Sequence, residues 1–199
     1  MSVWKKMAPF ERRELYYFNT AKEFEAAELA AKMYTMIQEE LERQQKREVL
    51  FLCIGTDRST GDSLGPLIGH KLQERNLNHV KILGTLDRPV HAMNLEDYLR
   101  ILENRYARHL IVAIDASVGR TDHVGFITLG KGSLKPGLGV SKELRAVGDI
   151  FITGIVSSCG NYDPLMLQSI RLSVVMRLAD CISDSICLVE KLWTSMALV

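Results

Sequence analysis

Residues 49–55 read Val-Leu-Phe-Leu-Cys-Ile-Gly, and this stretch decides the class of the fold. Six consecutive apolar residues end at a glycine, without any alternation of polar and apolar side chains. A strand that is apolar on both faces is typical of the interior of a parallel sheet, because helices cover both of its faces. A second run of this kind, Leu-Ile-Val-Ala-Ile at 110–114, ends at Asp115. The two runs therefore predict neighbouring strands at the centre of a mostly parallel sheet.

Helical and extended patterns alternate on either side of these two strands. Apolar residues at steps of three or four predict helices over about residues 20–48, 64–72, 94–102 and 163–192. Short apolar runs predict further strands at residues 80–83, 124–129 and 150–156. Because strands alternate with helices, we predict one α/β domain over residues 1–199 with helices on both faces of the sheet.

Three of the predicted helices begin with recognisable capping signals. Thr20 with Glu23 forms a capping-box pattern, Asn94 is a typical N-cap residue, and Asp163-Pro164 combines a cap with a proline at the first helical position. Residues 1–19 mix aromatic and basic side chains without periodicity. We interpret them as an arm, held by Trp4 and Phe10, that docks on the domain or on a second subunit.

Composition excludes several classes of protein. The chain has 199 residues, 47% of them apolar and 25% charged, and its net charge is +1. No overall field attracts nucleic acid or an anionic membrane, and no run approaches the roughly 18 apolar residues of a membrane span. The cysteines form no C-x-x-C pair, which is typical of reduced thiols in a cytosolic protein. We expect a cytoplasmic protein with no cofactor, no metal, no membrane contact and no direct nucleic-acid contact.

Polar side chains follow both central strands. The loop at 55–66 reads Gly-Thr-Asp-Arg-Ser-Thr-Gly-Asp-Ser-Leu-Gly-Pro, and Asp115 ends the second strand. Ligands of open α/β sheets bind at the carboxyl ends of the strands, so Asp62 and Asp115 are predicted to approach each other there. Two close carboxylates do not both ionise easily, and one keeps a proton. Such a pair can divide the general-base and general-acid roles.

Other interpretations of these residues remain open. Asp62 could simply N-cap the following helix, Asp115 could accept hydrogen bonds from loop amides, and Asp57 competes with Asp62 as the loop carboxylate. Gly61-Asp-Ser-Leu-Gly65 also matches the G-x-S-x-G elbow of serine hydrolases, with Ser63 as the nucleophile. We disfavour a serine esterase, because the final 76 residues contain no histidine to complete a triad in the usual chain order.

Three segments resemble a known family. Gly-Asp-Ser-Leu-Gly-Pro at 61–66 is similar to the Pro-Asp-Ala-Leu-Gly-Pro loop of the spore germination protease. Val-Ala-Ile-Asp-Ala at 112–116 resembles its Ala-Ile-Asp-Ala strand end, and Lys-Pro-Gly-Leu-Gly-Val at 135–140 resembles its His-Pro-Gly-Ser-Gly-Val segment. The chain looks closer still to the YyaC group of sporulation proteins, which are small relatives of that protease.

The resemblance implies the three-layer phosphorylase/hydrolase-like α/β/α fold that the hydrogenase-maturation endopeptidases share. It implies an atypical aspartic peptidase in which Asp62 and Asp115 are the catalytic pair. The expected substrate-binding residues are Asp57, Lys135, Gly137 and Gly139. The maturation endopeptidases place a metal-binding histidine near the position of Lys135, and a protonated lysine is a poor ligand, so we expect no metal.

The resemblance also implies a biological setting. The expected substrate is a protein or peptide, such as the small acid-soluble spore proteins, in the mother cell or forespore of a spore-forming bacterium. The alternative is a non-catalytic sporulation protein that keeps the fold and binds a peptide or partner. Whether the chain forms a homo-oligomer stays open.

Overall fold

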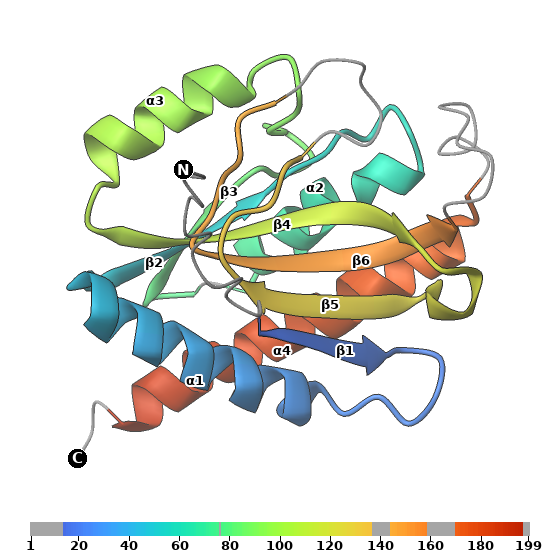
Figure 1. Ribbon diagram of the computed structural model, residues 1–199, viewed down its shortest axis with the longest axis horizontal. Helices are drawn as coiled ribbons and strands as arrows, with labels where there is room; N and C mark the ends of the chain where they lie inside the picture. Colours follow the sequence, from blue (N-terminus) through green and yellow to red (C-terminus); the bar gives the residue numbers. More distant parts are fainter. Residues whose placement is uncertain (1–13, 76, 137–143, 159–169, 197–199) are drawn as a thin grey trace, which may run out of the picture.

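The computed structural model describes residues 14–75, 77–136, 144–158 and 170–196, and in this part of the chain six strands form one sheet (Figure 1). The strands are β1 (Leu15–Asn19), β2 (Glu48–Cys53), β3 (Val80–Leu83), β4 (His109–Gly119), β5 (Phe126–Lys131) and β6 (Ile150–Ser158). The helices are α1 (Ala26–Gln44), α2 (Leu64–Gln73), α3 (Leu95–Arg105) and α4 (Leu172–Met196), with short 3-10 turns η1 (Gly61–Ser63) and η2 (Thr121–His123).

The sheet has the order β1-β5-β6-β4-β2-β3 and is mostly parallel. Strands β3, β2, β4 and β6 run parallel to one another, whereas β5 is antiparallel to β6 and β1 is antiparallel to β5. Val49 pairs with Leu110, and Cys53 pairs with Ile114. The predicted α/β class and the predicted neighbouring pair of central strands are both confirmed.

The two faces of β2 explain its continuous apolar sequence. Val49, Phe51 and Cys53 pack into the core formed with α1, α2 and α4, while Leu50 and Leu52 pack beneath α3. Figure 1 shows α1 and α4 on one side of the sheet and α3 on the other. Because both faces are covered, a polar side chain anywhere from Val49 to Cys53 would be buried away from water.

The capping box predicted at Thr20 and Glu23 is wrong. Helix α1 begins at Ala26, and its N-cap residue is Glu25. The Thr20 hydroxyl instead donates a hydrogen bond to the carbonyl oxygen of Gly125 at 2.6 Å. Thr20 therefore fastens the turn after β1 to the start of β5, and α1 begins six residues later at Ala26.

The N-terminal arm is also corrected in part. Leu15–Asn19 forms strand β1, which pairs with β5, so these residues are not irregular. Phe18 is buried in the core, and the Nζ atom of Lys32 lies 4.0 Å from the ring centre of Tyr16. A strand of five residues is too short for an alternation of buried and exposed side chains to be recognised from the sequence alone. Trp4 and Phe10 lie outside the described residues.

The bounds of β4 and α4 also differ from those predicted, and the Asn94 side chain does not cap α3. Strand β4 continues four residues beyond Asp115, because β6 runs beside it as far as Ser158. Asn94 precedes α3 as predicted, but its side-chain amide accepts from the His91 amide at 2.8 Å and donates to the Pro89 carbonyl at 3.0 Å. Helix α4 begins at Leu172, and the cap predicted at 163–164 lies outside the described residues.

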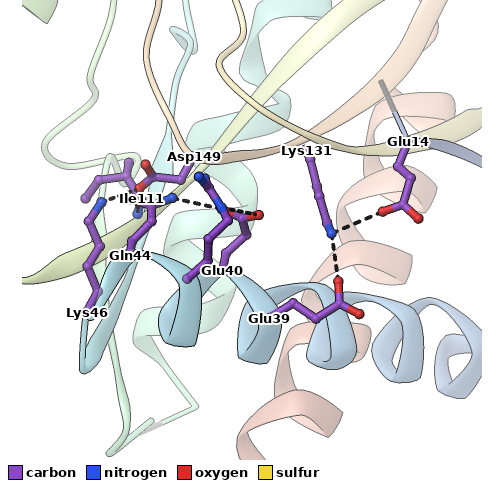
Figure 2. Close-up of polar contacts among 9 residues, drawn as sticks. Glu14, Glu39, Glu40, Gln44, Lys46, Ile111, Lys131 and Asp149 are labelled. Carbon is purple, nitrogen blue, oxygen red and sulfur yellow. Dashed lines mark hydrogen bonds and ion pairs between the residues drawn. The ribbon is translucent and has the colours of Figure 1, made fainter. Parts of the chain in front are cut away.

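Polar contacts fasten α1 to the sheet (Figure 2). Asp149 accepts a hydrogen bond from the Ile111 amide at 2.8 Å and pairs with Lys46 at 2.7 Å. Lys131 on β5 pairs with Glu39 at 2.7 Å and with Glu14 at 3.2 Å. These contacts fix the amino ends of β4 and β6 against the end of α1. None of the described helices is sufficiently long and apolar to span a membrane.

Candidate functional site

The loop after β2 closes tightly on itself and fixes Asp62. The Thr56 amide donates to the backbone carbonyl of Asp62 at 3.0 Å. Gly55 has a φ of 144°, and a Cβ atom there would collide with the same carbonyl oxygen. Only glycine combines this backbone conformation with so close an approach. The loop therefore places Asp62 in η1, at the start of α2 and at the carboxyl edge of the sheet.

Neighbouring backbone holds this loop in place from two sides. The Gly55 amide donates to the Val90 carbonyl at 2.8 Å, which ties the loop to the segment between β3 and α3. A Cβ atom at Gly65 would collide with the backbone of Ile54, so α2 starts directly against the end of β2. Backbone contacts of the loop and of the start of α2 thus fix the position of Asp62.

Asp115 lies on β4 just past the end of β2. Its predecessor Ile114 pairs with Cys53, the last residue of β2, while Asp115 itself pairs with Thr153 on β6. The side chain is buried, and one carboxylate oxygen accepts a hydrogen bond from the Ala116 amide at 2.8 Å.

The structure brings the segments that carry the two aspartates to one corner of the sheet. Turn η1 lies against β4. Immediately after η1, Leu64 packs onto β6, where a Cβ atom at Gly154 would collide with its side chain. Gly154 pairs with Ala116, the residue that follows Asp115. The start of α2 is therefore seated on the same part of the sheet as Asp115.

Burial is the main influence on the ionisation of Asp62. The side chain is partly buried, and this raises the pKa of its carboxyl group. The Ser59 hydroxyl faces the carboxyl group and lowers the pKa to a smaller extent. Ser59 Oγ is itself buried, and no described group forms a regular hydrogen bond with it. A carboxyl group in these surroundings keeps its proton to a higher pH than an exposed aspartate does.

The other residues predicted at the site divide into three groups. Asp57 is exposed in the loop after β2, at the carboxyl edge of the sheet, and Lys135 is exposed in the segment that follows β5. Gly137 and Gly139 lie outside the described residues. Ser63 is buried, and its hydroxyl donates to the Thr60 carbonyl at 2.7 Å, which gives it a structural role in η1. Among the described residues, no group of three or more histidine, cysteine, aspartate or glutamate side chains could hold a metal ion.

Sequence reasoning missed two parts of this corner. Ser59 is the neighbour of Asp62, but nothing in a loop sequence tells which hydroxyl turns inward. Val90 joins the loop through a single bridge to Ile54, which is too short to leave a periodic pattern. The presence of Ser59 three residues before Asp62 in a tight loop is the one signal that could have suggested their contact.

Comparison with known proteins gives three findings. The family model described as "Protein of unknown function (DUF1256)" matches residues 21–185. The "Uncharacterized protein YyaC" of Bacillus subtilis (strain 168) is 39% identical over 165 residues, which cover 83% of this chain and 80% of that protein. The solved structure of the [NiFe] hydrogenase maturation protease HycI from Thermococcus kodakarensis KOD1 is similar over 70% of this chain and 92% of that chain, with 17% identity and a TM-score of 0.39.

Proposed function

Since the chain belongs to the DUF1256 family and is closely similar to YyaC, we propose that it is a sporulation-related peptidase of the germination-protease type, with Asp62 and Asp115 as its catalytic residues. The observation that carries the proposal is the seating of a partly buried aspartate in η1 against the strand that bears a second, buried aspartate. This arrangement lies at the carboxyl edge of the sheet, where α/β enzymes bind their ligands.

The surroundings of the two carboxyl groups suggest different roles. Burial favours the protonated form of Asp62, which can donate a hydrogen bond to a peptide carbonyl oxygen. We assign the role of base, which accepts a proton from water, to Asp115, whose carboxylate accepts a hydrogen bond from the Ala116 amide. The water oxygen then attacks the carbonyl carbon while Asp62 protonates the carbonyl oxygen. When the tetrahedral intermediate collapses, the C–N bond breaks and the amine leaves with the proton that Asp115 had taken, while one hydroxyl of the intermediate returns its proton to Asp62 and the carbonyl group re-forms.

The substrate follows from the family resemblance. We propose a protein or peptide, with small acid-soluble spore proteins as the first candidates, in the mother cell or forespore. Asp57, Lys135 and the glycines at 137 and 139 would border the cleft, and the exposed positions of Asp57 and Lys135 are compatible with this role. The proposed reaction uses no cofactor or metal, because two carboxyl groups supply both the acid and the base.

The test is cleavage of purified small acid-soluble spore protein, followed by mass spectrometry of the products. We expect the native chain to cleave, and Asp62→Asn and Asp115→Asn each to lower the rate at least about a hundredfold, the usual contribution of an acid or base. Asp97→Asn on the exposed face of α3 is the matched control and should cleave normally.

Three results would contradict the proposal. Full activity in both site variants, together with loss of activity in Ser63→Ala, would instead indicate a serine hydrolase. Activity that disappears with a chelator and returns with zinc or nickel would indicate a metal enzyme. Tight binding of the spore protein without cleavage would favour the non-catalytic binding protein.

A further inference from the structure

A hollow opens at the amino edge of the sheet, at the opposite end of the strands from Asp62 and Asp115. It has a volume of about 420 Å³ and is lined by Gln45, Arg47 and Arg108. Arg47 immediately precedes β2, and Arg108 immediately precedes β4. The hollow is therefore framed by the end of α1 and by the first residues of the two central strands.

The fold holds the two arginines side by side. The Arg47 amide donates to the Arg108 carbonyl at 3.2 Å, and the next residues along the chain, Glu48 and His109, are paired in the sheet. Both arginines are exposed. Like charges at directly neighbouring positions of adjacent strands repel each other. An anion between the two guanidinium groups would remove this repulsion.

Three acidic side chains around this corner already have other partners. Glu40 binds Arg43, Asp149 binds Lys46, and Glu48 lies 2.9 Å from His109. Glu42 borders an adjoining hollow together with Arg47, but it forms no ion pair with Arg47 or Arg108. Within the part of the chain that the structure describes, Arg47 and Arg108 have no carboxylate partner.

The carbonyl groups at the C-terminus of α1 repel an anion less strongly than those of an uncapped helix would. Gln45 adopts the left-handed conformation, with φ 54° and ψ 32°. Its amide donates to the Glu42 carbonyl at 3.2 Å, and the Lys46 amide donates to the Leu41 carbonyl at 3.0 Å. Two of the last carbonyl groups of the helix are thus already satisfied.

We propose that this hollow binds a phosphate-bearing anion through the guanidinium groups of Arg47 and Arg108 and the side-chain amide of Gln45. Two guanidinium groups offer planar pairs of N–H donors that match phosphate oxygens, and the amide adds a further donor. The volume accommodates more than a single phosphate group. The proposal concerns a different edge of the sheet from the candidate catalytic site and does not depend on it.

The test measures binding of inorganic pyrophosphate to the full chain by calorimetry and thermal unfolding at low ionic strength. At about ten times its Kd, pyrophosphate should raise the Tm by roughly 3 to 6 °C. Sodium chloride at the same ionic strength should not. Arg47→Gln and Arg108→Gln should each weaken binding at least about tenfold, since each removes a charged donor pair.

Arg100→Gln, which removes an exposed arginine from α3, is the matched control and should bind like the native chain. Without pyrophosphate, Arg108→Gln should unfold at the native temperature or slightly above it, because the repulsion is gone. Equal binding by the Arg108→Gln and Arg100→Gln variants would overturn the proposal. So would stabilisation by a short single-stranded oligonucleotide but not by pyrophosphate, which would indicate a nucleic-acid surface instead of a phosphate site.

Discussion

At the scale of single residues, Asp62 links stability to pH. Burial raises its pKa in the folded chain, so the folded state binds this proton more tightly than the unfolded state does. The stability that this proton contributes is complete below the unfolded pKa, for which the ordinary value is 3.8, and falls as the pH rises through the folded pKa. Above the folded pKa the buried charge therefore destabilises the fold.

We predict that Asp62→Asn unfolds at a higher urea concentration than the native chain at pH 7, and that the difference disappears below pH 4. Ser59→Ala should raise the pKa of Asp62 further, because the hydroxyl that lowers it is removed. Carbon-detected NMR titration of the Asp62 carboxyl group measures this directly. Ser59→Thr, which keeps a hydroxyl, is the control, and an unchanged pKa in Ser59→Ala would show that the two side chains do not interact.

At the scale of secondary-structure elements, the contact between α2 and β6 positions η1. Gly154 leaves the space that the Leu64 side chain occupies, so Gly154→Ala should destabilise the fold by about 1–3 kcal/mol through overpacking. Leu64→Ala should cost about 2–5 kcal/mol, because Leu64 is fully buried.

The double variant should be more stable than the sum of the two changes predicts, since the smaller side chain makes room for the added methyl group. Urea unfolding of the native chain, the two single variants and the double variant completes this double-mutant cycle. Strict additivity would mean that the two residues do not touch, and that the seating of α2 on β6 has another cause.

At the scale of the whole molecule, the sheet should open from its antiparallel edge. Strand β1 is five residues long, lies at the edge of the sheet formed by the described strands, and carries Leu15 and Tyr17 exposed at 40% and 49%. Strands β2 and β4 lie inside the sheet and are buried. Hydrogen exchange followed by mass spectrometry should therefore show exchange at β1 well before β2 and β4, which open only with global unfolding. Equal protection of β1 and β2 would contradict this order.

The sequence by itself determined the centre of the molecule. The run at 49–54 has no polar position, and a strand of that kind is stable only between two neighbours and beneath helices on both faces. The same argument applies to 110–114, so the neighbouring strands, the mostly parallel sheet and the edge at which polar residues gather were all predictable. These features follow from the burial of a continuous stretch of chain. Such burial is visible in the sequence as an unbroken run of apolar residues.

Only the tertiary structure decided the features that depend on a distant partner. Thr20 reads as a helix cap, but its hydroxyl bonds to Gly125, and Leu15–Asn19 becomes a strand because β5 offers it an edge. Asp115 does not end its strand, because β6 extends beside it. The inward turn of Ser59 toward Asp62 depends on a loop closed by the Thr56 amide. In each case the deciding contact joins residues that no local pattern relates, because hydrogen bonds and burial are satisfied in space and not along the chain.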